Sequence, residues 1–466
     1  MHSAFFRYSP FYIDFKNVLC YTYLNNDRDM GTGPDIHSIT EVKMKQKNDV
    51  YRKSRALYII SAALEYFISI LTGSAYLAKI SGSIGIKDST VGVLTSFVSL
   101  GCAFQIVSLA MRTDRPVKRM VTLTNLANQL CFTLLYVVPV VNLPKDVKTA
   151  VFVLLLLSGN ILLNIPFSPK VTWSRSLVDD NKRGIFSATC EITSLISGMI
   201  FTVIAGRTID HFEEMGNQAG AFIVCGIAIF VLTASHALCL TFMREDKREA
   251  SEESTALKHR LRIALTDKST LTLIPVFVLW NMSMYSTMPF FGTYQLNELS
   301  LSMTAVSLIS VTYSIIRALV SAPLGMLGDK RSFITSMTVS LCAMSIGLIV
   351  NGLGGRASFV IFYVLYAVTL AGMNSGIMNM IFDYVDPQKR VGAIAILYTI
   401  GGLVGFFTTL IAKPLVDAIQ SNGNRFLFIK HVYAQQVLSI IGAILALLTM
   451  LYLNTIVRRL TSQRKR

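Results

Sequence analysis

Three ionisable side chains lie inside long apolar stretches of this chain and are the residues best placed to do chemistry. They are Glu65, Glu191 and Arg317. A charge inside such a stretch is costly in a lipid bilayer, so a charge that is kept there indicates a pathway for ions or solutes. Glu65 is the leading candidate for a proton carrier, because a carboxyl group in apolar surroundings can load and release a proton near neutral pH.

Each of the three has a second interpretation. Glu65 could be a structural residue that is capped by hydroxyls or paired with a Lys, and Glu191 could pair with an Arg of a loop. Arg317 could bind an anionic solute or neutralise an acid. At the helical rise per residue, Glu65 lies about 12 Å and Glu191 about 10 Å into its stretch, so both acids are expected deep in the membrane.

Amide and aromatic side chains collect in the same stretches, and together they would suit a hydroxyl-rich solute such as a sugar. The predicted cavity-lining residues are Asn160, Asn164, Trp280, Asn281, Tyr285, Asn374 and Asn379. The alternative is helix packing, because Asn and small residues also join membrane helices. His236 is expected to be structural.

The apolar stretches predict the secondary-structure elements that hold these residues. Of the 466 residues, 52% are hydrophobic and only 15% are charged, whereas soluble domains carry roughly 25% charge. A membrane helix needs about 20 apolar residues. The pattern predicts an all-α integral membrane protein with twelve spans: Leu57–Ile80, Thr90–Met111, Val121–Val141, Val147–Phe167, Gly184–Ile209, Ala219–Phe242, Leu271–Gly292, Met303–Met326, Phe333–Leu353, Ala357–Ile381, Gly392–Ile419 and Tyr433–Ile456.

The basic residues predict the orientation of the chain. Most Lys and Arg residues cluster in the tails and in alternate loops, and such residues stay on the cytoplasmic side. We therefore expect a multi-pass protein of the cell membrane with both termini in the cytoplasm. The same placement explains the net charge of +16 without a nucleic-acid partner.

The charges also divide the chain into segments. We expect a cytoplasmic tail over 1–54, a six-helix bundle over 55–243, a cytoplasmic linker over 244–268, a second bundle over 269–457 and a basic tail over 458–466. Residues 1–43 fit poorly: they are either an over-extended start, with the natural start at Met30 or Met44, or a disordered tail.

Two phrases of the sequence occur twice. The segment Val178–Gly184 reappears as Val385–Gly392, and Asp114-Arg115 is matched by Asp329-Lys330. Both repeats have nearly the same offset, and each lies between apolar stretches. A membrane protein of two similar halves explains both repeats, and this architecture indicates movement of a solute.

The loop phrases resemble the signature of the major facilitator superfamily, over roughly Arg55 to Arg459. The family phrase is Gly-x-Leu-Ala-Asp-Arg-x-Gly-Arg-Lys, and the first copy departs from it at Ala110 and Val117, where the family prefers Gly. The resemblance implies twelve helices in two pseudo-symmetric six-helix bundles. It also implies a cytoplasmic gate made by Asp114, Arg115, Lys118, Arg119, Gly325, Asp329, Lys330 and Arg331.

The gate has a physical rationale. An acid at the membrane surface can face the positive N-terminus of a neighbouring helix. Asp114 is expected to contact the helix that starts at Gly392, and Asp329 the helix that starts at Gly184. These contacts would hold the cytoplasmic side shut and break when it opens.

Several function classes lack their signatures. The chain has no Gly-x-x-x-x-Gly-Lys-Ser/Thr loop, no His-Glu-x-x-His phrase and no CxxC pair among its seven Cys residues, so we expect no cofactor, no metal and no enzyme activity. The preferred hypothesis is a monomeric secondary transporter, with membrane lipid as its surroundings and a proton or other ion as its coupling partner, that takes up a small polar solute. A proton-coupled exporter of drugs or amphipathic compounds is the alternative. A sensor or an intramembrane enzyme is less favoured.

Overall fold

The protein is almost entirely helical, in agreement with the predicted class. The computed structural model describes residues 36–110, 117–178, 183–245, 265–386, 389–426 and 429–459. The helices of the first half are α2 (Ile36–Leu71), α3 (Ser74–Ile84), α4 (Asp88–Thr95), α5 (Phe97–Ala103), α6 (Gln105–Ala110), α7 (Lys118–Val137), α8 (Lys145–Asn164), α9 (Phe167–Ser176), α10 (Arg183–Glu214) and α11 (Gln218–Phe242).

The second half is also built almost entirely of helices. Its helices are α13 (Lys268–Thr287), η2 (Met288–Phe290), α14 (Phe291–Thr293), η3 (Tyr294–Glu298), α15 (Met303–Lys330), α16 (Phe333–Gly352), α17 (Arg356–Tyr384), α18 (Arg390–Ser421), α19 (Ala434–Tyr452) and η4 (Leu453–Val457). Two short strands, β1 (Arg425–Phe426) and β2 (Ile429–Lys430), pair antiparallel beyond α18.

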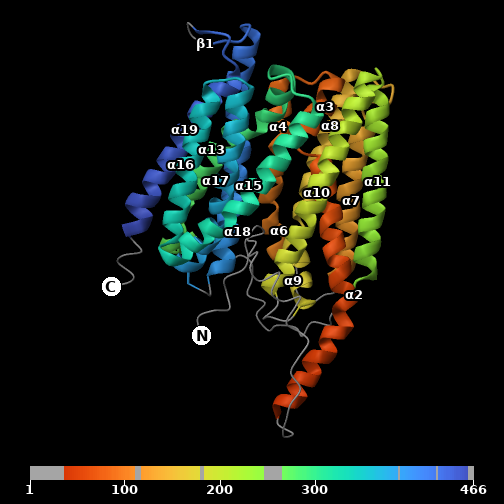
Figure 1. Cartoon of the computed structure of the whole chain (residues 1–466), viewed down its shortest axis with the longest axis vertical. Helices are drawn as coiled ribbons and strands as arrows, with labels where there is room; N and C mark the ends of the chain where they lie inside the picture. Colours follow the sequence, from red (N-terminus) through yellow and green to blue (C-terminus); the bar gives the residue numbers. More distant parts are fainter. Residues whose placement is uncertain are drawn as a thin grey trace.

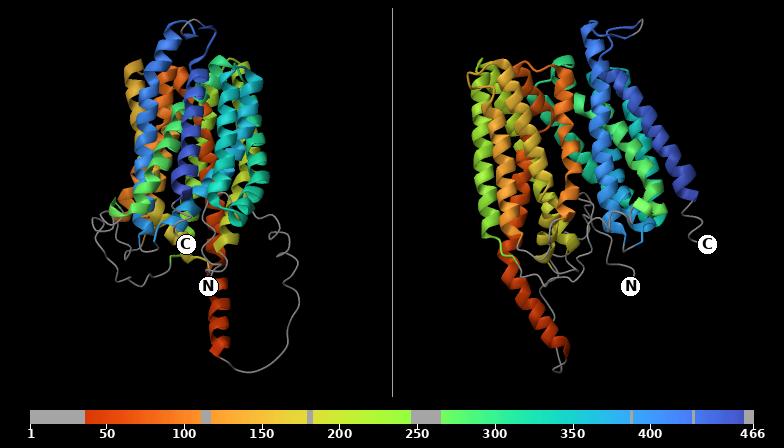
Figure 2. Two further views of the ribbon diagram at one scale, coloured as in Figure 1. Left: turned by 90° about the vertical axis from the view of Figure 1, so that its left-hand side faces the viewer. Right: turned by 180° about the vertical axis from the view of Figure 1, so that it is seen from behind.

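Within the described residues, twelve helical segments are long and apolar enough to cross a membrane, which confirms the predicted number of spans. Figures 1 and 2 show them as two groups that lie side by side, one from each half of the chain. Each group has an apolar core of its own: Tyr136 and Phe152 are fully buried in the first, and Phe359 and Phe362 in the second.

Some predicted spans are interrupted. The stretch Leu57–Ile80 was predicted as one helix, but it forms α2 and α3 with a break at Gly73, whose backbone is extended. The second span divides into α4, α5 and α6. The seventh span continues as far as Glu298, and a short 3₁₀ turn at Pro289 interrupts it because proline supplies no N–H for the helical ladder.

The fourth span also ends earlier than predicted. The stretch Val147–Phe167 was predicted as one helix, but α8 ends at Asn164 and α9 begins after Pro166. The break redirects the chain, and α9 then packs against α6 and α7. This redirection matters for the site, because α9 carries Lys170.

The first span begins and the last span ends at the same end of the molecule, which we call the inner end, and the opposite end is the outer end (Figure 1). The two halves are tightly joined toward the outer end. A Cβ atom at Gly92 would collide with the ring of Phe290, and one at Gly292 would collide with Ser74. Closer to mid-depth, the Ser99 hydroxyl donates to the Gly402 carbonyl oxygen at 2.9 Å.

Parts of the predicted domain organisation fall outside the described residues. These parts are most of the first 43 residues, the segment 246–264 of the predicted linker and the last seven residues of the basic tail. The boundaries proposed for the two bundles remain predictions.

Candidate functional site

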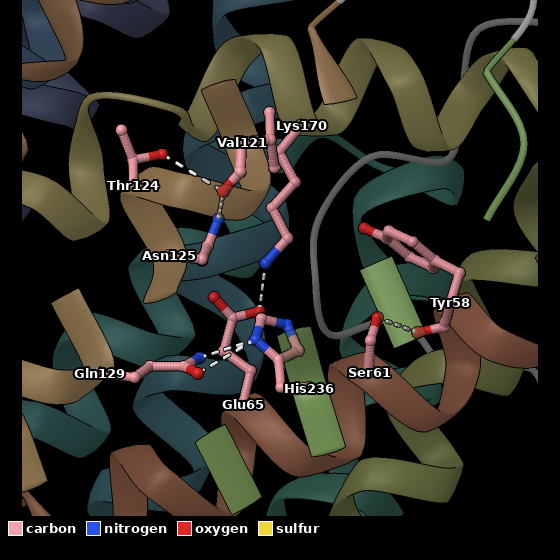
Figure 3. A network of polar contacts seen from close by, with 9 residues as sticks. All are labelled: Tyr58, Ser61, Glu65, Val121, Thr124, Asn125, Gln129, Lys170 and His236. Carbon is pink, nitrogen blue, oxygen red and sulfur yellow. Dashed lines mark hydrogen bonds and ion pairs between the residues drawn. The ribbon is translucent and has the colours of Figure 1, made fainter. Parts of the chain in front are cut away.

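The break before α9 brings a lysine to Glu65. The Lys170 Nζ lies 2.5 Å from the Glu65 Oε2, so α9 and α2 are joined by an ion pair between residues distant in sequence (Figure 3). The side chain of Lys170 is 13% exposed and that of Glu65 is 30% exposed. The structure therefore contains the Lys partner that the structural interpretation of Glu65 requires. The interpretation of Glu65 as a proton carrier stays a prediction.

Two further polar side chains lie beside this ion pair. Gln129 of α7 and His236 of α11 are both buried, and the Nδ1 of His236 is 2.9 Å from the Gln129 Nε2 and 3.1 Å from the Gln129 Oε1. The charges of Glu65 and Lys170 both act on the His236 ring. His236, which was expected to be structural, lies in this network. We call the network the Glu65 cluster: Glu65, Gln129, Lys170 and His236 (Figure 3).

A second set of polar side chains spans the boundary between the halves. Glu191 of α10 belongs to the first half and Arg317 of α15 to the second, and the charge of Arg317 acts on Glu191. Tyr66 of α2 lies close enough to both residues for their charges to influence its hydroxyl group. Two of the three predicted ionisable candidates are thus brought near each other, whereas Glu65 has its own partner.

Arg317 is held by aromatic side chains of its own half. It is buried, and its Nη1 donates to the Tyr313 hydroxyl oxygen at 3.0 Å. The Tyr313 ring stacks on Tyr366 of α17 with a centroid distance of 5.6 Å. Tyr363, one turn earlier on α17, accepts a hydrogen bond from the Gln295 amide at 3.1 Å. Arg317 thus sits among planar rings that carry hydroxyl groups.

We call Tyr66, Glu191, Tyr313, Arg317 and Tyr366 the midline cluster. The structure assembles it from α2, α10, α15 and α17. It contains hydrogen-bond donors, one acid and several ring faces, and this combination can hold a polar solute that has hydroxyl groups and a flat face.

The predicted amides of the fourth span bond mainly to their own helix. The Asn160 Nδ2 donates to the Leu156 carbonyl oxygen at 2.8 Å, and the Asn164 Nδ2 donates to the Asn160 carbonyl oxygen at 2.9 Å. Asn164 also accepts from the Gln105 amide of α6 at 2.9 Å. Both side chains are buried, and that of Asn164 lies against Gly101 of α5. This geometry matches the helix-packing alternative.

The three candidates of the seventh span have different surroundings. Trp280 lies in the apolar core of the second half, which is a packing position. Asn281 donates to the Phe277 carbonyl oxygen at 2.8 Å and lies against Gly401. Tyr285 lies at the boundary between the halves, where it and Ser99 of α5 both lie against Gly405 of α18.

The last two candidates are half-buried on α17. Asn374 and Asn379 make no hydrogen bond with any residue that the structure describes. Of the predicted amides, these two therefore keep free hydrogen-bonding capacity within the described part of the chain, and they remain candidates for contact with a solute.

The predicted gate is partly described. Asp114 and Arg115 lie outside the described residues, while Lys118 and Arg119 begin α7. The Glu245 carboxylate accepts from the backbone N–H groups of Val117 and Lys118 at 2.6 and 3.1 Å, and so caps α7. In the second copy, Gly325, Asp329 and Lys330 form the end of α15, and Arg331 follows it. The predicted contact of Asp329 with the start of α10 stays a prediction.

The repeated Val-Asp-x-x-Lys-Arg phrase joins neighbouring helices at the inner end. The Lys389 Nζ is 2.9 Å from the Asp267 Oδ1, and Asp267 also caps α13 by accepting from the Thr270 N–H at 3.0 Å. Arg390 donates to the Phe382 and Val385 carbonyl oxygens at the end of α17. The two bases of the phrase thus hold helix termini in place.

These contacts change the proton affinity of the pair. Partial burial raises the pKa of the Asp267 carboxyl, but the bonds from Lys389 and Thr270 outweigh it and hold that pKa below its ordinary value. Hydrogen bonds to Asp267 and Asp386 raise the pKa of the Lys389 ammonium group. Both groups are therefore charged over a wide pH range.

Several site residues escaped the sequence analysis. Lys170 was assigned to a loop, and only the combination of Pro166 with a following basic residue could have signalled it. Tyr313 precedes Arg317 by four residues, a spacing that places two side chains on one helix face. Tyr66, Tyr363 and Tyr366 carry no signal beyond their position in apolar stretches.

Comparison with known proteins assigns the chain to a family. The sequence profile of the Major Facilitator Superfamily matches residues 58–302 and again residues 282–466. The chain belongs to this superfamily and is a transporter of the multi-pass membrane class, as the resemblance implied. No curated protein matches the chain in sequence.

Solved structures agree on the fold. The nucleoside transporter NupG is 12% identical with a TM-score of 0.64, covering 86% of this chain and 98% of its own. The xylose transporter XylE from E. coli is 12% identical with a TM-score of 0.60, over 87% and 98%. A bacterial homolog of the human lysosomal transporter Spinster, in an inward-facing and unoccupied conformation, is 13% identical with a TM-score of 0.61, over 87% and 94%.

Proposed function

We propose that this protein is a secondary active transporter that moves a small polar solute across the cell membrane by alternating access, with a proton as the coupling ion. The observation that carries the proposal is that Glu191 of α10 and Arg317 of α15 come from opposite halves, on helices that pack against each other, and influence each other electrostatically. A site shared by both halves is rebuilt when they rock, so a solute bound there can be exposed to either compartment in turn.

The midline cluster is the proposed solute site. Arg317 offers planar donors, the Glu191 carboxylate accepts, and Tyr66, Tyr313 and Tyr366 offer hydroxyl groups and ring faces. A ring-bearing solute with several hydroxyl groups, such as a sugar, fits this set of partners. Asn374 and Asn379 of α17 are proposed as further contacts. The fold neighbours include proteins named as a nucleoside transporter and a D-xylose–proton symporter, which supports a search among such solutes.

The Glu65 cluster is the proposed proton site. Protonation of Glu65 would remove the negative partner of Lys170, and a buried Lys without a partner is strongly unfavourable. Lys170 would then leave its place, and α9 would move with it. Because α9 follows the Pro166 break and lies toward the inner end (Figure 1), a proton on Glu65 can bias the conformation there.

Orientation and assembly complete the proposal. Both termini lie in the cytoplasm, as the distribution of Lys and Arg predicts, so the inner end faces the cytoplasm. The closed outer end then corresponds to a cytoplasm-facing conformation. The protein works as a monomer, with the boundary between its halves as the solute pathway.

The test uses purified protein reconstituted in liposomes. Thermal shifts across a library of sugars, nucleosides and small organic acids select the solute, and uptake of its labelled form is measured with an acidic exterior. We expect accumulation against the solute gradient that collapses when an ionophore removes the proton gradient. Accumulation that is indifferent to the ionophore would contradict proton coupling. Chemical change of the solute without movement would contradict transport.

The direction of transport is decided by the same liposomes. An acidic exterior that drives solute inward corresponds to uptake with the proton. If the acidic compartment instead loses protons while solute leaves through exchange, the protein is a proton-coupled exporter, which is the competing hypothesis.

A further inference from the structure

At the outer end, two acids each meet the start of a helix of the other half, one through backbone N–H groups and one through a side-chain hydroxyl. Asp210 of α10 lies opposite the start of α15, and its two carboxylate oxygens accept from the backbone N–H groups of Met303 and Thr304 at 2.8 and 2.7 Å. Asp417 of α18 lies opposite the start of α4, and its carboxylate accepts from the Ser89 hydroxyl at 2.5 Å. In each case the acid belongs to one half and the helix start to the other.

The two contacts are copies within the internal repeat. Asp210 and Asp417 are 207 residues apart, the same separation as Arg183 and Arg390 at the starts of their helices. Their targets are also matched, because Ser89 and Thr304 are both the second residue of the helix that they begin. The separation of these two residues, 215, equals that of Asp114 and Asp329 in the two gate loops.

The contacts suit the electrostatics of a helix start. The first N–H groups of a helix lack intrahelical partners and carry partial positive charge, so a carboxylate there is favourable. The hydroxyl of Ser302 caps α15 from its own half by accepting from the Ala305 N–H at 3.2 Å, which leaves the earlier donors for Asp210. On α4, Asp88 binds Asn297 at 2.9 Å, a second contact between the halves beside Asp417.

We propose that Asp210 and Asp417 form an outer latch with two parts. Each acid binds the start of a helix of the other half and so stabilises the conformation in which the outer end is closed. The latch rests on the alternating access of the proposed function. Opening of the outer end must separate α10 from α15 and α18 from α4. Asp210 then loses the N–H groups of α15 and Asp417 loses the Ser89 hydroxyl, while Asp417 keeps Lys413 of its own helix at 3.9 Å. The latch therefore sets how often the outer end opens, independently of which solute is bound.

The latch is tested by distances between the halves without any solute. Spin labels on Met215→Cys and Leu353→Cys, in a protein whose native Cys residues are replaced, report the separation at the outer end, where both side chains are exposed. Asp210→Ala and Asp417→Ala are each expected to raise the ratio of open to closed populations about fivefold, the factor for losing a helix cap at Asp210 or a single hydrogen bond at Asp417. The double variant is expected to raise it about 25-fold, because separate contacts on one equilibrium multiply.

The matched control is Glu214→Gln, which removes an exposed acid from the same end of α10 that makes no ion pair with the other half in the described part of the chain. It is expected to leave the distances unchanged. A double Asp variant with the wild-type ratio would overturn the latch, as would a control that opens the protein equally. A wild-type protein that never populates an open outer end under any condition would instead contradict alternating access itself.

A second measurement applies if the Ala variants do not fold. The pairs Ser89→Cys with Asp417→Cys, and Asp210→Cys with Thr304→Cys, are expected to form disulfides on mild oxidation, leaving only the closed distance until a reductant is added. A folded protein in which neither pair forms a disulfide would show that these residues do not meet, and the proposal would fail.

Discussion

The Lys170 ammonium group lies 2.5 Å from the Glu65 carboxylate, across 105 residues of sequence. The pair connects α2 to α9, a short helix that exists because Pro166 interrupts the fourth span. Two opposite charges in such partly buried surroundings stabilise each other only while both are ionised. Removal of either charge is therefore expected to destabilise the contact between α2 and α9 strongly.

Glu65→Gln is therefore expected to abolish proton-driven accumulation while solute counterflow continues, since exchange does not require release of the proton. Both are measured in liposomes with the labelled solute. The matched control is Glu213→Gln, which breaks another Lys–Glu contact of the first half, the 2.6 Å pair with Lys79 at the outer end, and it should retain accumulation. Undiminished accumulation by Glu65→Gln would remove this residue from the coupling mechanism.

Arg317→Lys is expected to raise the KM for the solute at least about tenfold with a smaller effect on kcat, because an ammonium group cannot reproduce the planar donors of a guanidinium. Tyr313→Phe removes the hydroxyl that Arg317 holds at 3.0 Å and should raise KM by a smaller factor, about fivefold.

The control for Arg317 is Arg356→Lys. Arg356 begins α17 at the outer end, ten residues before Tyr366, and binds the Leu299 and Ser300 carbonyl oxygens there. Initial uptake rates over a range of solute concentrations separate KM from kcat. Equal KM values for Arg317→Lys and wild type would place the solute site elsewhere.

The sequence was sufficient for the class, the number of spans and their order, because apolar length and the placement of Lys and Arg are local properties of the chain. The two repeats indicated the two halves for the same reason. The breaks were harder to predict. Gly73 and Pro166 lie inside the predicted spans Leu57–Ile80 and Val147–Phe167, and a count of apolar residues does not register a single Gly or Pro there.

The candidate site was less accessible to sequence reasoning. Glu65, Glu191 and Arg317 stand out because a charge in an apolar stretch is rare, whereas a tyrosine there is ordinary. The packing of Tyr366 on Tyr313 depends on how α17 lies against α15. The spacing of residues within one helix cannot predict this arrangement of two helices. Trp280 shows a second limit of sequence reasoning. An aromatic side chain in a span is compatible with a solute site or with the apolar core, and the structure places Trp280 in the core.

The pH dependence of stability is expected to follow Asp267 and Lys389. The lowered pKa of Asp267 means that its contribution is complete above the ordinary Asp value of 3.8 and is lost as the pH falls through the lower, folded value. The raised pKa of Lys389 means that its contribution is complete below 10.5 and is lost as the pH rises through the higher, folded value.

Asp267→Asn should therefore lower the apparent Tm between these limits and converge with wild type at lower pH. Asn can still cap α13, so Asp267→Ala, which loses the cap as well, should cost about 1 kcal/mol more. Thermal unfolding in detergent at several pH values measures both variants. A constant difference between Asp267→Asn and wild type at every pH would contradict the role of the ion pair.

The last prediction concerns the inner gate. Asp114 and Asp329 are expected to face the starts of α18 and α10 when the inner end is closed, since each acid would there meet unpaired N–H groups. Asp114→Asn or Asp329→Asn should remove that charge and make the closed inner end less stable, which slows the return step of the transport cycle. We expect turnover several-fold lower with the order of preferred solutes unchanged, measured by competition between unlabelled solutes. Asp146→Asn, on the exposed outer start of α8, is the control and should transport normally. A change in which solute is preferred would mean that these loops contact the solute and do not gate its path.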